Sequence, residues 1–339
     1  LTLRADGSSR FAPGKKWGYF PSVALAWNMT NEDFMRSITW LDNLKIRASY
    51  GKIGNTGIPP YVTQGGLLRN PYSFNNKGVL GYAPYQLRNP NLTWETTASS
   101  NIGFDFSLFK GRLSGSFDVY KQKTTDLLLN RLLPPSEGFP SVLENIGATE
   151  NKGVEAALSA IILQTPGGFT WSTDVNFFIN REKIVSLGNG AKSDPGNAWF
   201  VGQPITVYYD YQKIGIWQDE AAAQVYKAHQ GEIQLRDVNN DKKIDANDRV
   251  VLGSQQPDWS GGMTQRFSWK GIDLSIVAFA RVGNMVKSDF YQNYNTLFGR
   301  YNNLDINYWT PANPTNDFPR PNRNQERPNN YTTLSYFDG

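Results

Sequence analysis

Residues 237–248 are the segment of this chain whose side chains are best suited to chemistry. They read Asp-Val-Asn-Asn-Asp-Lys-Lys-Ile-Asp-Ala-Asn-Asp, with side-chain oxygens at positions 1, 3, 5, 9 and 12 of the run. An EF-hand-type calcium loop takes ligands at these positions and a main-chain carbonyl from position 7. The candidate calcium ligands are therefore Asp237, Asn239, Asp241, Lys243 through its carbonyl, Asp245 and Asp248.

Two residues of this acidic segment depart from a tight calcium loop. Lys242 stands at position 6, where the sharp turn usually carries glycine, and Asp248 replaces the longer bidentate glutamate of position 12. No flanking helices are evident. The alternative is a solvated acidic turn, partly neutralised by Lys242, Lys243 and Arg249. If calcium binds, the side-chain oxygens should converge on one point. We predict no other cofactor.

Aromatic side chains are concentrated in two long connecting segments, where they could contact a ligand or a partner protein. Aromatic residues make up 14% of the chain. A sugar ring can stack on their flat faces, and a protein lid can pack on them. The candidates are Tyr61, Tyr72, Tyr82, Tyr85, Tyr294, Tyr301 and Trp309. The alternative, which we favour for any single ring, is that these rings pack among themselves and order the segments.

The remaining reactive residue types argue against an enzyme. His229 is the only histidine and there is no cysteine, which excludes histidine-based triads, two-histidine metal sites, disulfides and thiolate chemistry. No pattern pairs two carboxylates across a sugar, and residues 51–55 lack the Gly-Lys-Ser/Thr end of a phosphate loop. We predict no catalytic residue and expect His229 to be exposed and without a role. The 34 basic residues are scattered among 30 acidic ones, which does not indicate nucleic-acid binding.

The elements that must position these segments are long alternating strands. Between residues 94 and 128, two such runs are joined at Lys110-Gly111. One predicted face carries Ile102, Phe104, Phe106, Leu108, Phe117 and Val119, and the other carries Asp105, Ser107, Ser116 and Asp118. Alternation over this length is typical of a membrane β-barrel, with apolar side chains toward lipid and polar ones toward the lumen. A soluble antiparallel sheet with one face on a core is the alternative.

The same pattern recurs along the chain and separates the connections into two kinds. The predicted strands are 1–6, 18–28, 44–51, 94–109, 112–128, 147–163, 169–186, 261–269 and 272–282. Short connections (110–111, 164–168, 270–271) alternate with long ones (7–17, 52–93, 129–146, 187–260, 283–339), and only 29–43, with a brief helical turn near 31–35, breaks the order. Short turns on one side and long extracellular loops on the other are the outer-membrane arrangement. No run of 18 apolar residues indicates a transmembrane helix.

Several motifs, taken in order, resemble the SusC/RagA-like TonB-dependent outer-membrane transporters. The matching segments are Asp6–Phe11, Trp17–Ser22, Leu44–Gly51, Gly54-Asn55, Asn89–Glu95, Asn145–Gly147, Asn151–Glu155, Trp309–Pro314 and Pro319-Arg320. The resemblance covers essentially all 339 residues, but only the middle-to-late part of the family's barrel. The family's N-terminal extension, energy-coupling box, plug domain and last strands are not matched.

The resemblance implies an all-β fold, an antiparallel transmembrane β-barrel segment with long extracellular loops. Residues 1–339 would be an open part of a plugged barrel of ~22 strands, with 187–260 as one long extracellular loop region. The chain begins and ends within strand-like segments, so we expect a fragment whose strands 1–6 and 272–282 are the edges of an open sheet.

The implied function is nutrient import across the outer membrane of a Gram-negative, Bacteroidetes-type bacterium. Energy would come through TonB, a SusD-like surface lipoprotein would act as a lid, and the substrate would be an oligosaccharide or, second, a peptide. The competing hypothesis is a secreted carbohydrate-binding or glycan-hydrolysing β-domain, and a third is a non-energised porin-like barrel. Partition of the intact protein into the aqueous phase without detergent would remove transport.

Overall fold

The computed structural model describes residues 1–294, 304–321 and 331–338. It divides into two compact units. The first comprises Leu1–Ser193, Phe200–Gln203 and Ser260–Ala280, and the second comprises Asp194–Trp199, Pro204–Trp259 and Arg281–Gly339. None of the helices in the described ranges is long and apolar enough to cross a membrane.

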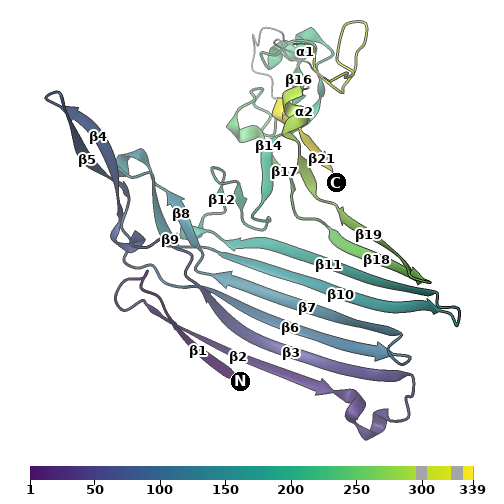
Figure 1. The fold of residues 1–339 in the computed structure, drawn as a ribbon. Coiled ribbons are helices and arrows are strands. Elements are labelled where there is room, and N and C mark those ends of the chain that lie inside the picture. Colours follow the sequence, from purple (N-terminus) through teal and green to yellow (C-terminus); the bar gives the residue numbers. More distant parts are fainter. Residues whose placement is uncertain (295–303, 322–330, 339) are drawn as a thin grey trace. The chain divides into compact units, whose positions relative to one another are not determined.

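The first unit is built on a nine-stranded antiparallel sheet (Figure 1). Its strands, in spatial order, are β1 (Thr2–Gly7), β2 (Trp17–Asn28), β3 (Leu41–Asn55), β6 (Glu95–Leu108), β7 (Leu113–Thr125), β10 (Ala148–Gln164), β11 (Thr170–Ser186), β18 (Trp259–Trp269) and β19 (Ile272–Val282). All nine predicted strands are confirmed. The predicted edges are confirmed too, because β1 and β19 stand at the two ends of the strand order.

Within the first unit, the short connections lie at one end of this sheet, and the long connections 7–17, 52–93 and 129–146 lie at the other (Figure 1). Tight turns join β6 to β7 and β18 to β19, and in the latter both Lys270 (φ 48°) and Gly271 (φ 82°) have the left-handed backbone of a type I′ turn. Residues 29–40 lie at the same end and contain the short 3₁₀ helices η1 (Met29–Asn31) and η2 (Asp33–Met35), which confirms the predicted helical turn.

Two of the long connections fold into hairpins that the alternation analysis missed. The 52–93 segment contains η3 (Val62–Gln64), β4 (Gly66–Phe74) and β5 (Lys77–Gln86). The 129–146 segment contains most of β8 (Leu128–Leu132), η4 (Pro135–Glu137) and β9 (Ser141–Asn145). The signal in the first case was Asn75-Asn76, which turns the hairpin with both residues at positive φ.

The two faces of the sheet differ in chemistry as predicted. The register places Ile46, Phe104 and Phe117 side by side on one face, and the rings of Phe104 and Phe117 stack with centroids 5.6 Å apart. These side chains do not lie in a closed core, since Ile102 on the same face is 65% exposed. A soluble sheet would cover such a face, so its exposure favours the lipid-facing interpretation.

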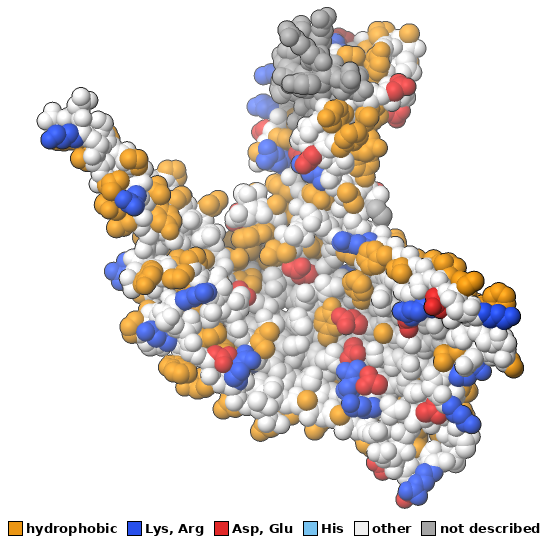
Figure 2. Space-filling model, viewed as in Figure 1, with side chains coloured by type: hydrophobic (Ala, Val, Ile, Leu, Met, Phe, Trp, Pro, Cys, Tyr) orange, Lys and Arg blue, Asp and Glu red, His pale blue; other side chains and the backbone are white. Residues whose placement is uncertain are grey.

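The opposite face is polar. Arg47 donates hydrogen bonds to Asp105 and Asp118 across three strands, with guanidinium nitrogen to carboxylate oxygen distances of 2.9 Å. Figure 2 shows acidic and basic side chains grouped together on one face of the sheet. The predicted placement of Asp105 and Asp118 away from the apolar face is therefore confirmed.

A small hydrophobic core lies at the long-connection end of the first unit. It consists of Phe11, Ile58, Val62, Leu92 and Leu143, with Trp94 packed against it. Glycine is required next to this core, because a Cβ on Gly54 would lie 2.1 Å from the ring of Phe20.

The second unit has small two-stranded sheets and a core of its own. Its elements are β14 (Val207–Tyr211) with β17 (Arg249–Ser254), β15 (Lys213–Ile216) with β16 (Ile233–Leu235), β20 (Met285–Lys287) with β21 (Tyr336–Asp338), α1 (Glu220–Val225), α2 (Asp289–Tyr294), η6 (Ala246–Asp248) and η7 (Tyr331–Leu334). Three further short elements lie near residue 190: η5 (Gly188–Gly190), β12 (Ser193–Asp194) and β13 (Trp199–Phe200). The core contains Ile216, Ile233, Leu235, Trp309 and Leu334. The predicted loop region 187–260 thus shares a core with residues that follow β19.

Candidate functional site

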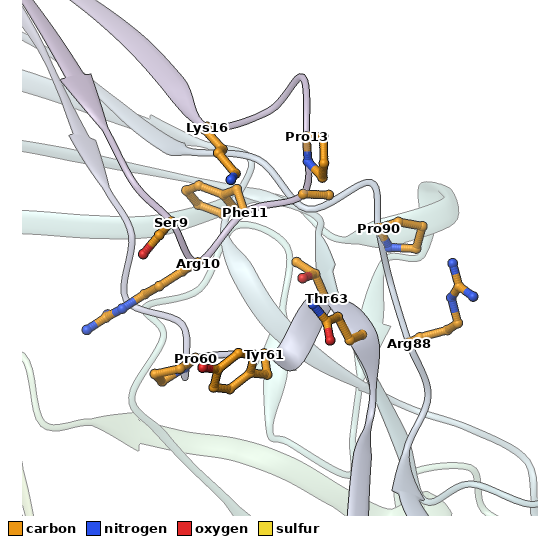
Figure 3. Close-up of a pocket in the computed structure, with 12 residues that line it drawn as sticks. Ser9, Arg10, Phe11, Pro13, Lys16, Pro60, Tyr61, Thr63, Arg88 and Pro90 are labelled. Atoms are coloured by element: carbon orange, nitrogen blue, oxygen red, sulfur yellow. The ribbon is translucent and has the colours of Figure 1, made fainter.

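A basic pocket of about 600 Å³ opens in the first unit at the long-connection end of the sheet (Figure 3). It is lined by the β1–β2 connection, by the segment around η3 and by residues that precede β6. The lining residues are Ser9, Arg10, Phe11, Ala12, Pro13, Lys16, Pro60, Tyr61, Thr63, Gln64, Arg88 and Pro90.

Core packing fixes the position of this pocket. Phe11 is almost completely buried against the small core, so its neighbour Arg10 is held at the pocket wall. The Arg10 guanidinium donates a hydrogen bond to the carbonyl of Thr56 over 3.1 Å. The carbonyl of Lys16 accepts the indole N–H of Trp94 over 3.3 Å. Buried aromatic residues therefore support the cationic wall.

The charge of the pocket is one-sided. Arg10, Lys16 and Arg88 line it, and none of the described lining residues is acidic. None of the three forms an ion pair within the described part of the chain. Three unneutralised cations around one cavity suit a carboxylate, sulfate or phosphate group. Sequence reasoning missed this site, because the three residues are far apart in the chain and belong to no motif.

Tyr61 is the one predicted aromatic candidate in this pocket. Its side chain is 73% exposed, and Figure 3 shows it next to Pro60. Its backbone has a φ of 65°, a left-handed conformation that costs energy for any residue with a Cβ. The fold holds a strained tyrosine at the pocket wall, where its ring face is available to a ligand.

The other aromatic candidates separate into exposed rings and core rings. Tyr72, Tyr82 and Tyr85 lie on the β4–β5 hairpin and are at least half exposed, so the packing that we favoured for them is wrong. Trp309 is only 5% exposed and donates its indole N–H to Gln218 over 2.9 Å. Its assignment as a ligand residue is wrong, because its faces are occupied by the core.

The two remaining aromatic candidates follow β20. Tyr294 ends α2, and its ring centroid lies 4.9 Å from that of Phe290. This contact is the mutual packing that we favoured for single rings. Tyr301 lies outside the described residues.

The acidic segment directs its carboxylates to its own backbone N–H groups. Asp237 accepts hydrogen bonds from the backbone N–H groups of Asn240 and Lys242, over 2.7 and 2.9 Å. Lys242 has a φ of 62°, so the turn that normally requires glycine forms with a lysine. Asp248 is fully buried and accepts the N–H groups of Val238 and Asp245, over 2.9 and 2.8 Å.

The other polar side chains of this segment also accept hydrogen bonds from nearby backbone N–H groups. Asn239 accepts from the N–H of Asp241, Asp241 from that of Lys243, and Asp245 from that of Asn247. Among the described residues, no group of three or more acidic, histidine or cysteine side chains is placed to hold a metal ion. The predicted convergence on one point is therefore not found. Calcium binding itself stays a prediction.

His229 is partly buried in a hydrogen-bonded cluster, so the expectation that it is exposed is wrong. Its Nδ1 lies 2.6 Å from the carboxylate of Glu220, which also accepts the backbone N–H of Gln230 over 2.7 Å. These bonds, led by the Gln230 N–H and followed by Gln224 and His229, lower the pKa of Glu220 from 4.5 to about 2. The cluster joins the first residue of α1 to the segment that follows the helix, and it contains no nucleophile.

The polar face of the sheet is the largest candidate surface. Besides the Arg47 cluster, Tyr120 donates to Asn180 over 2.8 Å, and Asp174 accepts from Ser159 over 2.6 Å and pairs with Arg266. These groups satisfy one another and leave no catalytic arrangement. They form a hydrophilic wall, which could line a path for polar solutes.

Comparison with known proteins gives a consistent result. Residues 1–206 match the family described as "TonB dependent receptor-like, beta-barrel". TonB-dependent receptor P26 of Formosa agariphila is 36% identical over 337 residues, which cover 94% of this chain and 34% of the relative. TonB-dependent receptor SusC of Bacteroides thetaiotaomicron is 32% identical over 318 residues, covering 86% of this chain and 30% of the relative.

Solved structures agree with the sequence relatives. The structure of the RagAB peptide transporter superimposes with a TM-score of 0.83 and 25% identity, covering 99% of this chain and 37% of the matched chain. The RagAB peptide importer in its closed-closed state gives 0.81 and 26%, with the same coverage. The chain thus spans about a third of the length of the proteins that it matches.

Proposed function

We propose that this chain, which belongs to the TonB-dependent receptor-like β-barrel family, forms part of the wall and loops of a SusC-like nutrient importer. Its place would be the outer membrane of a Gram-negative, Bacteroidetes-type bacterium. TonB would supply energy through a segment that is not among these residues, and a SusD-like surface lipoprotein would cover the loops. No bond would be made or broken by the protein.

The observation that carries the proposal is the contrast between the two faces of the nine-stranded sheet. Water would penalise an exposed row such as Ile46, Phe104 and Phe117, whereas acyl chains accept it. A charge at the bilayer midplane costs ~2–4 kcal/mol, and the Arg47, Asp105 and Asp118 cluster avoids this cost on the polar face. The family membership favours this barrel over the secreted carbohydrate-binding β-domain.

Two observations bear on the substrate. Exposed tyrosines on the β4–β5 hairpin could stack on sugar rings, which supports an oligosaccharide. The basic pocket of Arg10, Lys16 and Arg88 could hold a terminal carboxylate, and the likeness to the RagAB peptide transporter adds support for a peptide. Oligosaccharide remains the first candidate and peptide the second.

Ligand binding to the full-length protein that carries this chain tests the proposal. Calorimetry with oligosaccharide and peptide mixtures should show binding by the detergent-solubilised protein. Loss of sugar binding in Tyr72→Ala/Tyr82→Ala would support the first substrate, and loss of peptide binding in Arg10→Ala/Arg88→Ala the second. Lys77→Gln, at the start of β5, is a matched control. Partition of the intact protein into the aqueous phase without detergent would overturn the proposal.

A further inference from the structure

The apolar face of the sheet changes abruptly to a basic one toward the long-connection end. On β7, apolar Phe117 and Val119 are followed on the same face by Lys121 and Lys123. Neighbouring β10 and β11 change in the same way, from Val154 to Lys152 and from Ile179 to Arg181 and Lys183. The change occurs at the same level on all three strands, because the register aligns Val119, Val154 and Ile179.

The register gathers these cations into two cross-strand rows. One row runs Lys121, Lys152, Arg181, and the next runs Lys52, Ala98, Lys123, Glu150, Lys183. We call the six cations the basic rows: Lys52, Lys121, Lys123, Lys152, Arg181 and Lys183. Adjacent strands are ~4.8 Å apart, and like charges directly opposite one another destabilise a sheet. Nearby negative charge is therefore needed to offset the repulsion among these cations.

The chain itself supplies only part of that counter-charge. Glu150 pairs with Lys121 over 2.9 Å and with Lys183 over 3.4 Å. Lys123 and Lys152 are exposed and have no acidic partner within the described ranges. Lys123 and Lys152 therefore have open positions for an external anion.

The position of the basic rows along the strands, relative to the apolar band, indicates which anion they bind. On β11 the outward residues from Trp171 to Ile179 span eight residue steps, ~26 Å along the strand, which matches the ~25 Å apolar band of an outer-membrane barrel. Trp171 stacks on Phe267 at the short-turn end of this band, as interfacial aromatics do. The basic rows follow at the other limit of the band, where headgroups replace acyl chains.

We propose that the basic rows bind the phosphate groups of lipid headgroups in the leaflet next to the long connections. The inference rests on the proposed membrane location and adds a ligand to it. Lysine suits the position, because its alkyl stem can lie along the last apolar residues while the ammonium reaches the headgroup. The charge complementarity and the continuity with the apolar band both favour a lipid over an acidic protein.

Native mass spectrometry of the full-length protein tests the proposal. Phosphatidylglycerol and phosphatidylcholine with the same acyl chains are titrated onto the detergent-solubilised protein. We expect phosphatidylglycerol to bind about tenfold more tightly, and Lys123→Gln/Lys152→Gln to lose most of that preference. Lys15→Gln/Lys77→Gln removes the same charge away from the basic rows and should keep the preference. An unchanged melting temperature confirms that both variants fold.

Three outcomes would overturn the proposal. Equal binding of the two lipids, or a preference that survives Lys123→Gln/Lys152→Gln, would show that the rows do not select phosphate headgroups. Displacement of phosphatidylglycerol by inorganic phosphate would show a site for soluble anions. Failure of the membrane assignment is distinguishable, since the protein would then partition into water without detergent, whereas a membrane-embedded protein without lipid preference removes this inference alone.

Discussion

The nine-stranded sheet and the second unit obtain their stability in opposite ways. In the sheet, large apolar side chains such as Ile102 remain exposed, and the strands are held by the hydrogen-bond ladder. In the second unit, Ile216 and Trp309 are buried in a core between short strands and connecting segments. The contrast teaches that the sheet depends on its surroundings for apolar contact, while the second unit supplies its own.

The largest effect is expected from opening the core of the second unit. Trp309→Ala removes a buried indole and its hydrogen bond to Gln218, which should cost about 3–5 kcal/mol of unfolding free energy. Hydrogen exchange should rise in β15 and β16 and stay unchanged in β6 and β7. Tyr72→Ala, at an exposed ring, is the control. Equal loss of protection in the sheet would contradict the independence of the two regions.

A charge on the apolar face should have the next largest effect. Leu158→Arg, level with Val175 in the middle of the apolar band, places a guanidinium toward the acyl chains and should cost ~2–4 kcal/mol of folding stability in bilayers. Ala157→Arg, one residue away on the polar face, should be nearly neutral. Unfolding titrations in lipid vesicles measure both. Similar values for the two variants would show that the faces do not differ in their surroundings.

Removal of the buried carboxylate of the acidic segment should have an intermediate effect on the free energy of unfolding. Asp248→Ala leaves the backbone N–H groups of Val238 and Asp245 without their acceptor, at a cost of about 1–3 kcal/mol. Asp241→Ala removes an exposed carboxylate and should change stability by less than ~0.5 kcal/mol. Thermal unfolding of the second unit measures the difference. A silent Asp248→Ala would mean that the segment is not fixed by this residue.

Calcium should stabilise the same segment only modestly. A weak site occupied at 100 times its dissociation constant adds about 2.7 kcal/mol, and a lysine at position 6 predicts lower occupancy. Proteolysis at residues 237–248 should slow with calcium and recover with a chelator, and Asp237→Ala should abolish the effect. Cleavage that is indifferent to calcium and chelator would leave the hydrogen-bonded acidic turn as the whole explanation.

The smallest effect is expected from acid at the Glu220 cluster. The folded-state pKa of about 2 lies below the unfolded value near 4.5, so this carboxylate stabilises the folded state above pH 4.5 and loses that contribution as pH falls toward 2. After correction for intrinsic rates, protection of the Gln230 amide should decrease over this range. Glu220→Gln should remove the pH dependence. Identical profiles in both proteins would contradict the assignment.

The same comparison explains what the sequence could predict. Every second residue of a two-faced strand has one kind of neighbour, so β6 and β7 could be predicted from alternation to within three residues of their ends. The second unit has no such period. Trp309 and Tyr72 look alike in sequence, yet one is buried and the other exposed, because only the tertiary fold decides which aromatic residue meets a core.

The basic pocket could not be predicted from the sequence, for a related reason. Arg10, Lys16 and Arg88 come together through the packing of the β1–β2 connection against the segment before β6, a contact between residues about 80 positions apart. The basic rows could in principle have been found, since each strand carries its cations two residues beyond the apolar run. Their alignment, however, depended on the register between strands.

The division of the second unit along the chain has a consequence for the order of biosynthesis. Its core joins Ile216, Ile233 and Leu235 to Trp309 and Leu334, which lie on either side of β18 and β19 in the chain. The backbone N–H of Asp258 and the carbonyl of Val282, at the two ends of that hairpin, are hydrogen-bonded over 2.7 Å. The core therefore cannot close until the hairpin has been translated, and a chain truncated after residue 260 would expose half of a hydrophobic core to proteases and chaperones.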